Sequence, residues 1–129
     1  MTMSTIILID DDISVNYFHR RLITLLNLSE DIHTFFNGKQ ALEGIIEINK
    51  NAGPGQKAIV FLDLNMPLMS GWEFLEEFEK IKDDLNLICN IHVISASLNP
   101  VDRERAEKNP NVISYIGKPL SKETLMNCM

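Results

Sequence analysis

The sequence predicts an α/β fold, a doubly wound parallel sheet of five strands with five helices on its two faces. Three observations lead to this prediction. Short β-rich apolar runs alternate with stretches whose apolar residues recur every three or four positions, the pattern of βαβ units. The run Ala-Ile-Val-Phe-Leu at 58–62 is continuously apolar, as in a strand buried on both faces. Polar residues directly follow the strands, where ligands bind in open α/β sheets.

The first strand is expected at 6–9 and the first helix at 13–27. The helix is predicted from apolar residues at helical spacing, which are Phe18, Leu22, Leu25 and Leu26. Asp12 is well placed to cap it by accepting a hydrogen bond from a free backbone N–H of the first turn. His19 is followed by two arginines, and we expect this group to lie on a solvated helix face rather than to form a phosphorylation site.

A second strand is expected at 32–36, with Asn37 as a candidate cap for the helix behind it. That helix is predicted from a second set of regularly spaced apolar residues, which are Ala41, Leu42, Ile45 and Ile46. Residues 51–55, Asn-Ala-Gly-Pro-Gly, form a loop by composition, and the buried strand at 58–62 follows.

The second half of the chain repeats this alternation. A helix over about 71–82 is expected from three regularly spaced apolar residues, which are Phe74, Leu75 and Phe78. Two further strands are expected at 91–95 and 112–116. Between them Pro100 suits the first turn of a short helix, and a last helix runs from Ser121 to the end of the sequence.

The composition is that of an ordinary globular domain. The chain has 129 residues, 45% of them hydrophobic and 23% charged, and its length predicts one domain. Lys plus Arg is 12 and Asp plus Glu is 18, so the formal charge of −6 argues against nucleic acid or an anionic membrane as the main partner. The apolar runs are shorter than the ~18 residues of a membrane helix. Cys89 and Cys128 lack metal-ligand spacing; two free thiols in a reducing cytoplasm are expected, with a disulfide between them as the alternative.

Residues that suit one chemical site follow four of the strands. Asp10 and Asp11 follow the first strand and Asp63 the third, whereas Ser95 stands at the end of the fourth and Lys118 follows the fifth. Right-handed crossovers place the carboxyl ends of parallel strands at one edge, so we expect these side chains to gather there. Asp10 and Asp11 could supply the carboxylates that Mg²⁺ takes. Asp63 could act as a nucleophile and become an acyl phosphate, with Lys118 and Ser95 stabilising the transferred group.

In these residues and their order, the chain resembles the receiver domain of two-component response regulators, the chemotaxis-regulator-like family. The matching segments cover nearly the whole chain and are Ile9-Asp10-Asp11-Asp12, Phe36-Asn37-Gly38-x-x-Ala41-Leu42, Leu62-Asp63-Leu64-Asn65-Met66-Pro67-x-x-Ser70-Gly71, Ile94-Ser95-Ala96 and Gly117-Lys118-Pro119. The resemblance implies a flavodoxin-like sheet in the strand order 2-1-3-4-5. It also implies a single receiver domain over 1–129 with no output domain.

The resemblance further implies roles for individual residues. Asp63 would be the phospho-acceptor and would also be a ligand of the Mg²⁺ ion. Asp11 would bind Mg²⁺ directly and Asp10 mainly through water, with Asn65 adding its backbone carbonyl. Asn65 and Ser97 also occupy positions that tune dephosphorylation in the family.

The same resemblance implies how the site responds to a phosphoryl group. Ser95 would bind the group and swing toward it, and Lys118 would pair with it. Tyr115 matches the aromatic position that turns inward on activation. The peptide bond between Lys118 and Pro119 is cis in the family.

The expected function is a phosphorylation switch rather than an enzyme, catalysing only its own phosphorylation and dephosphorylation. The resemblance implies a sensor histidine kinase or phosphotransfer protein as donor, Mg²⁺ as cofactor, and a downstream protein reached through protein–protein contacts or onward phosphotransfer. Two alternatives remain open. A Mg²⁺-dependent phosphatase with an aspartyl nucleophile often has a second acid two residues after it, where this chain has Asn65. A phosphorylation-independent binding module would have lost at least one of the site residues, and all are present.

Overall fold

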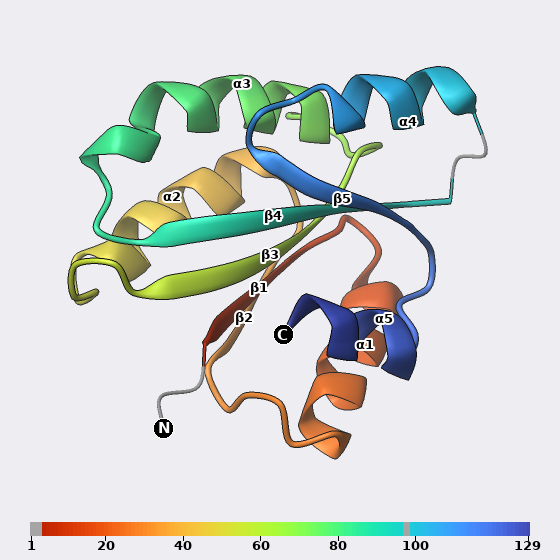
Figure 1. Ribbon diagram of the computed structural model, residues 1–129, viewed down its shortest axis with the longest axis horizontal. Helices are drawn as coiled ribbons and strands as arrows, with labels where there is room; N and C mark the ends of the chain where they lie inside the picture. Colours follow the sequence, from red (N-terminus) through yellow and green to blue (C-terminus); the bar gives the residue numbers. More distant parts are fainter. Residues whose placement is uncertain (1–3, 97–98) are drawn as a thin grey trace.

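In the computed structural model, five parallel strands form one sheet in the order β2-β1-β3-β4-β5 (Figure 1). The structure describes residues 4–96 and 99–129. The strands are β1 (Thr5–Ile9), β2 (Ile32–Phe35), β3 (Lys57–Asp63), β4 (Ile88–Ser95) and β5 (Val112–Gly117). This is the flavodoxin-like doubly wound arrangement. The predicted fold class and strand order are therefore confirmed.

Helices cover both faces of this sheet. Within the described residues they are α1 (Ile13–Leu25), α2 (Gly38–Asn49), α3 (Gly71–Ile81), α4 (Pro100–Glu107) and α5 (Lys122–Cys128), with a 3₁₀ turn, η1 (Lys82–Asp84), after α3. Figure 1 shows α1 and α5 below the sheet, with α2, α3 and α4 on the opposite side. Because all the neighbouring strands pair in parallel, the carboxyl ends of the five strands share one edge of the sheet.

Alternate residues of the central strands supply the two cores. In β1, Ile7 and Ile9 pack in the core beneath α2 and α3, whereas Ile6 and Leu8 pack in the core beneath α1 and α5. All four residues are at most 1% exposed. Because both faces of these strands are covered, their sequences are continuously apolar rather than alternating, which is why β1 and β3 are easily found from sequence.

Helix α1 presents a different face to the sheet from the one that its apolar spacing predicts. Its buried residues are Asn16, His19 and Ile23. Phe18 and Leu25, which the pattern counted as part of the apolar stripe, are 48% and 69% exposed. The prediction that His19 lies on a solvated face is wrong, because this side chain is fully buried.

Polar contacts account for this orientation of α1. Asn16 Nδ2 donates to the backbone carbonyls of Asp10 (2.9 Å) and Phe35 (3.2 Å). His19 Nε2 accepts a hydrogen bond from the backbone N–H of Leu120 (3.1 Å). A buried backbone group without a partner costs about 1–3 kcal/mol. These bonds give partners to backbone carbonyls at the ends of β1 and β2 and to a backbone N–H before α5. They therefore favour burial of the face of α1 that carries Asn16 and His19.

Side-chain caps begin the first two helices as predicted. Asp12 Oδ1 accepts from the backbone N–H of Ser14 (2.9 Å), and Asn37 Oδ1 accepts from that of Gln40 (2.9 Å). Strand β4 begins at Ile88, earlier than the predicted strand at 91–95, because it pairs with β3 along the whole length of that strand. Long-range pairing of this kind leaves no local pattern in the sequence.

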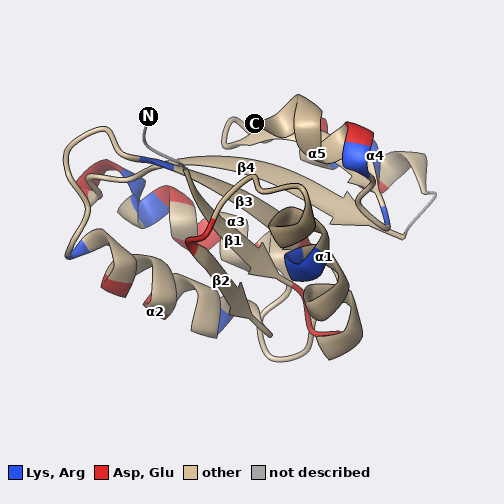
Figure 2. Cartoon of the chain, turned by 90° about the horizontal axis from the view of Figure 1, so that it is seen from below, with Lys and Arg blue, Asp and Glu red and all other residues tan. Residues whose placement is uncertain are grey.

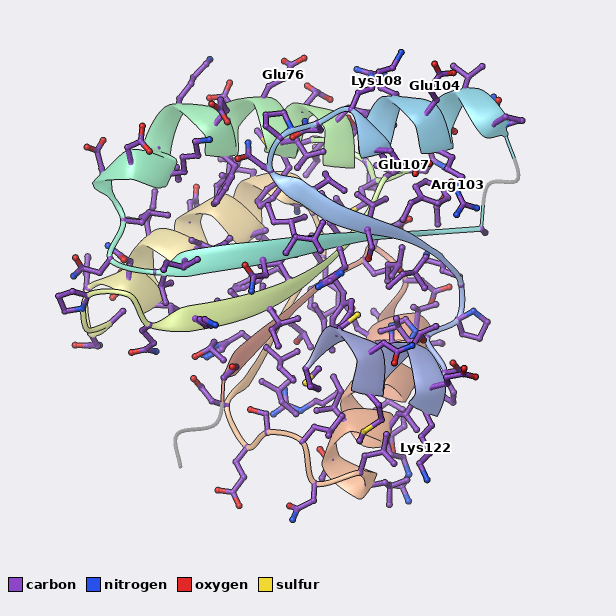
Figure 3. All side chains as sticks on the ribbon, in the orientation of Figure 1. Glu76, Arg103, Glu104, Glu107, Lys108 and Lys122 are labelled. Carbon is purple, nitrogen blue, oxygen red and sulfur yellow. The ribbon has the colours of Figure 1, made fainter. Side chains whose placement is uncertain are left out.

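Helix α4 is short and its surface is charged, as Figure 3 shows for Arg103, Glu104, Glu107 and Lys108. Arg103 Nε lies 3.2 Å from Glu107 Oε1, and Lys108 Nζ lies 2.9 Å from Glu104 Oε1. Exposed pairs of this spacing contribute about 0.3–0.5 kcal/mol each. One buried residue, Ala106, packs this helix on the sheet. The buried apolar contact between α4 and the sheet is therefore small.

Candidate functional site at the carboxyl ends of the strands

Four strands deliver polar side chains to one edge of the sheet. Asp10 directly follows β1, Asp63 and Ser95 are the last residues of β3 and β4, and Lys118 follows β5. Asp10, Asp63 and Ser95 are only 1%, 4% and 2% exposed. Figure 2 shows the acidic loop that leads from β1 into α1. The structure thus brings together the side chains that the strand ends predict.

Lys118 bridges the two buried carboxylates. Its Nζ lies 2.6 Å from Asp10 Oδ2 and 3.3 Å from Asp63 Oδ1. Asp10 Oδ1 accepts the backbone N–H of Asp12 at 2.9 Å. Asp10 Oδ2 makes the close contact with the ammonium of Lys118. This oxygen keeps capacity for a further cation or water.

The acidic side chains fit a magnesium ion. Ligand oxygens of Asp10, Asp11 and Asp63 all lie within 4.8 Å of one another. Asp11 is exposed, so the group opens to solvent on one side. Mg²⁺ prefers oxygen ligands and keeps several waters, and a partly open set of carboxylates meets both requirements.

Charge and burial shift the ionisation of this site. Burial, reinforced by the charge of Asp10, raises the pKa of Asp63 from 3.8 to about 6, although Lys118 acts in the opposite direction. Burial disfavours the charge of Lys118, but its hydrogen bond to Asp10 and the two carboxylates raise the pKa of this lysine overall. At neutral pH the pair therefore consists of an ammonium and an ionised Asp63.

The loop after β3 holds Asp63 in place through backbone contacts. The N–H of Gly71 donates to the carbonyl of Leu64 at 2.9 Å, and the carbonyl of Met69 accepts the N–H of Gly38 at 3.3 Å. A capping box between Ser70 and the third residue of α3 then starts that helix. The loop is thus tied back onto β3 and onto α2.

Replacing Gly71 by Ala is expected to lower the free energy of unfolding by about 2 kcal/mol, because overpacking commonly costs that much. A Cβ at Gly71 would stand 2.4 Å from the carbonyl oxygen of Asp63 and 2.8 Å from Cα of Leu64. Both contacts are with backbone, so the loop must move. Urea denaturation measures the change. Gly53→Ala is the matched control, since a Cβ there meets nothing within 4 Å. Equal losses in the two variants would contradict the close approach.

Ser95 and Tyr115 flank a hollow beside this site. The hollow has a volume of 340 Å³ and is lined by Ser95, Ala96, Asn99, Pro100, Arg103, Tyr115, Gly117 and Lys118. Tyr115 is half-buried, and the guanidinium of Arg103 lies 5.8 Å from the centre of its ring. The predicted cis peptide bond between Lys118 and Pro119 is present. Space for a ring movement therefore exists next to Ser95 and Lys118.

The predicted roles of Asn65 and Ser97 stay predictions. Asn65 is exposed in the loop that follows Asp63. Ser97 lies outside the described residues. Conversely, sequence analysis missed Asn16 and misplaced His19, although their spacing of three on one helix could have marked a shared polar face.

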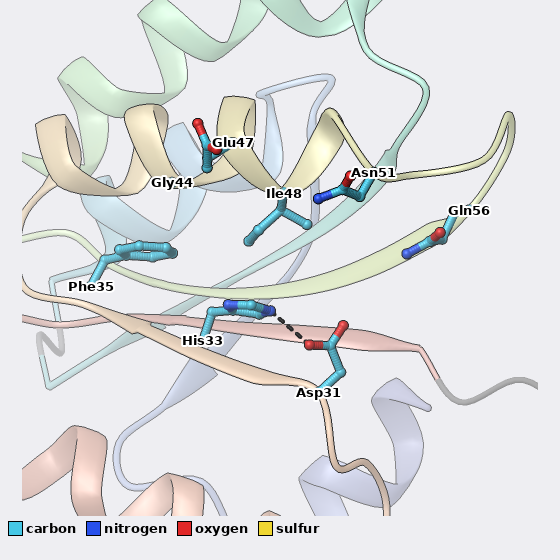
Figure 4. A pocket seen from close by; sticks show the side chains of 8 residues that line it. All are labelled: Asp31, His33, Phe35, Gly44, Glu47, Ile48, Asn51 and Gln56. Carbon is cyan, nitrogen blue, oxygen red and sulfur yellow. Dashed lines mark hydrogen bonds and ion pairs between the residues drawn. The ribbon is translucent and has the colours of Figure 1, made fainter.

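A second hollow, of 530 Å³, lies away from this edge between β2 and α2 (Figure 4). Its titratable groups already have partners, since His33 Nε2 lies 2.8 Å from Asp31 Oδ1 and Lys50 Nζ lies 3.0 Å from Glu47 Oε2. Thr5 Oγ1 also donates to Asp31 at 2.7 Å. These groups are adequately explained as structural contacts at the sheet edge.

The fold and the site are those of a receiver domain, a class of phosphoryl-accepting signalling modules. The chain belongs to the response regulator receiver domain family, whose family model matches residues 6–129. Receiver domains bind Mg²⁺ at an acidic pocket and interact with histidine kinases, phosphotransfer proteins and downstream effectors. Among residues 4–96 and 99–129, none of the helices combines the length and the apolar composition of a membrane span.

Comparison with individual proteins agrees with this assignment. The chain is 30% identical over 120 residues to a probable methanogenesis regulatory protein, FilR2, of Methanothrix harundinacea, covering 93% of this chain and 75% of the relative. It is 37% identical over 82 residues to the transcriptional regulatory protein CpxR homolog of Haemophilus influenzae, covering 63% of this chain but only 31% of that relative. A two-component response regulator from Cytophaga hutchinsonii has a solved structure with a TM-score of 0.83 and 30% identity, covering 99% and 95% of the two chains.

Proposed function

We propose that Asp63 accepts a phosphoryl group from a histidine kinase or a phosphotransfer protein in a Mg²⁺-dependent reaction. The observation that carries this proposal is the bridge of Lys118 between Asp10 and Asp63, with Asp11 beside it. One cation and a partly open set of carboxylates suit an incoming phosphoryl group.

Each residue has a defined part in the transfer. A carboxylate oxygen of Asp63 attacks the phosphorus in line with the donor nitrogen, so the P–N bond breaks as the new P–O bond forms an acyl phosphate. Lys118 stabilises the negative charge on the transferred oxygens, and the Ser95 hydroxyl donates a hydrogen bond to one of them. Asp11 would hold Mg²⁺ directly, with Asp10 through water and Asn65 through its carbonyl. The bound ion would neutralise charge on the phosphoryl oxygens.

The added group would then shift a conformational equilibrium. Ser95 moving toward the phosphoryl group would leave room beside the 340 Å³ hollow into which the Tyr115 ring can turn. We propose that this changes the surface formed by α4 and β5 and passes the signal to a downstream protein, or that the phosphoryl group is transferred onward.

Phosphodonor treatment tests the acceptor assignment. Wild type incubated with acetyl phosphate or phosphoramidate and Mg²⁺ should gain one acid-stable, base-labile phosphoryl adduct by mass spectrometry, and Asp63→Ala should gain none. Asp31→Ala is the control, because Asp31 lies away from the site and should leave the adduct unchanged. An adduct that persists in Asp63→Ala, or that never forms with any donor or kinase, would refute the proposal. Continuous release of phosphate from a substrate would instead favour the phosphatase alternative.

Removal of a single ligand tests the metal assignment. At a Mg²⁺ concentration a hundredfold above its dissociation constant, the free energy of unfolding of wild type should rise by about 2.7 kcal/mol. Asp11→Asn should lose this increase. Asp12→Asn is the matched control, because it removes the same charge one residue away and Asn caps a helix as well as Asp does. Urea denaturation with and without Mg²⁺ measures both, and equal responses in the two variants would exclude Asp11 as a ligand.

A further inference from the structure

Buried polar side chains that the proposed mechanism does not use lie on the inner face of α1. His19 is 0% exposed and Asn16 is 3% exposed. The two are three residues apart and so lie one turn apart on the same face of the helix. Asn16 is bound to the carbonyl of Asp10, which places this face directly against the acidic site.

His19 holds one end of the segment that carries Lys118. Its Nε2 accepts the backbone N–H of Leu120 at 3.1 Å, and Leu120 is 1% exposed. At the other end, the backbone N–H of Lys118 donates to the carbonyl of Ser95 at 3.0 Å. The segment from Lys118 to Leu120 is therefore attached to β4 at one end and to α1 at the other.

The hydrogen bond to Leu120 determines the tautomer of His19. A ring nitrogen that accepts a hydrogen bond carries no proton, so the proton of the neutral ring is on Nδ1. Burial lowers the pKa of His19 to about 4, although Asp10 acts in the opposite direction, and the ring is therefore neutral at neutral pH. A neutral ring keeps Nε2 available as the acceptor for Leu120.

The other ring nitrogen of His19 has no hydrogen-bond partner in the described part of the chain. Nδ1 of His19 and Oδ1 of Asn16 are both buried and have no hydrogen-bond partner among the described residues. One is a donor and the other an acceptor, and they lie on the same face of α1. Buried polar groups of this kind are commonly joined by an internal water.

We propose that His19 is a positioning residue for Lys118, which restrains the Lys118–Leu120 segment through Nε2 and is joined to Asn16 by a buried water through Nδ1–H. This inference rests on the proposed role of Lys118 at the phosphoryl group. An apolar side chain at position 19 leaves the N–H of Leu120 without its acceptor. The segment then moves more freely, and Lys118 Nζ spends less time within reach of Asp63.

Hydrogen exchange and phosphorylation kinetics test the restraint in a His19→Leu variant. The amide of Leu120 should exchange about fivefold faster than in wild type, and the adduct should form about fivefold more slowly, which corresponds to one hydrogen bond of about 1 kcal/mol. Amides of β1 and β3 report global opening and should exchange at the wild-type rate. His19→Gln supplies an amide oxygen as acceptor and should restore both quantities. His33→Leu, at the exposed sheet edge, should alter neither.

Several results would overturn the inference. The first is a wild-type exchange rate at Leu120 in His19→Leu, and the second is an unchanged rate of adduct formation in that variant. The third is a change of both rates in His33→Leu as large as the change in His19→Leu. If wild type formed no adduct, the proposed function would be refuted instead. The hydrogen-exchange rate of the Leu120 amide would then test, without phosphorylation, whether His19 restrains this segment. A high-resolution crystal structure should show an ordered water between His19 Nδ1 and Asn16 Oδ1, and a dry contact there would overturn the bridge.

Discussion

In a Lys118→Met variant, the phosphoryl adduct at Asp63 is expected to form about 100-fold more slowly than in wild type, the usual cost of removing one donor that stabilises transition-state charge. Lys118 is the cation nearest to both buried carboxylates, at 2.6 Å from Asp10 and 3.3 Å from Asp63. Methionine keeps a similar length and volume but carries no charge. The loss should therefore appear in the rate of adduct formation measured at saturating Mg²⁺.

The same variant should also be less stable without Mg²⁺, by about 3 kcal/mol in the free energy of unfolding, since removing one partner of a buried ion pair leaves an uncompensated charge and costs about 3–5 kcal/mol. We expect the lower end of that range because Asp63 can take up a proton instead of remaining charged. Mg²⁺ should recover part of it by replacing the missing cation.

Lys122→Met is the matched control for both measurements. Lys122 is an exposed lysine at the start of α5 and makes no ion pair with the acidic site (Figure 3). It should show the wild-type rate and stability within about 0.5 kcal/mol. A Lys118→Met protein that reacts as fast as wild type would remove Lys118 from the mechanism.

Asp63→Asn is expected to be more stable than wild type at pH 8 in the absence of divalent cations, while forming no adduct. The pKa of Asp63 is raised from 3.8 to about 6, first by burial and then by the charge of Asp10. Ionised Asp63 therefore opposes folding, and a neutral amide of the same shape does not. Two pKa units correspond to on the order of 3 kcal/mol, an upper value for the gain.

The direction of the pH dependence follows from this shift. Because the folded pKa lies above the unfolded one, the stability contributed by protonated Asp63 is fully present below about pH 3.8 and is lost as the pH rises through about 6. The difference between Asp63→Asn and wild type should accordingly be largest above pH 6 and vanish near pH 4. Urea denaturation at a series of pH values measures it. Addition of Mg²⁺ should narrow the difference, because the ion stabilises the ionised wild type.

Asp31→Asn provides a control of opposite sign. The pKa of Asp31 is lowered, first by the hydrogen bond from Thr5 and then by His33, so its charge supports the folded state. This variant should be less stable than wild type at pH 8. If both variants were stabilised alike, the gain in Asp63→Asn would reflect the loss of net negative charge and not the local environment of Asp63.

The site could be assembled from sequence because each of its residues stands beside a strong local signal. Asp10 and Asp63 end continuously apolar runs, and Lys118 follows the last strand and precedes a proline. The carboxyl ends of parallel strands joined by right-handed crossovers lie at one edge of the sheet. The residues that follow these strands are therefore expected to lie close together. The distances from Lys118 to both carboxylates agree with that expectation.

Helix α1 shows where such reasoning fails. Apolar spacing counts Phe18 and Leu25 toward the buried stripe, yet both are largely exposed. The rotation of α1 is decided by hydrogen bonds from Asn16 to the ends of β1 and β2 and from Leu120 to His19. Those partners are as much as 101 residues away along the chain, and no local pattern records them.

The sequence by itself determined the strands, their polar ends and the family to which the chain belongs, because apolar runs and residue order are local properties of the chain. Only the tertiary structure decided the rest. It set the rotation of α1, the burial of His19 and the raised pKa of Asp63, which depends on the burial of Asp63 and on the charges of Asp10, Asp11 and Lys118 beside it. The burial of Asp63 and the charges around it come from segments that are far apart in the sequence. They act on Asp63 only once the sheet has formed.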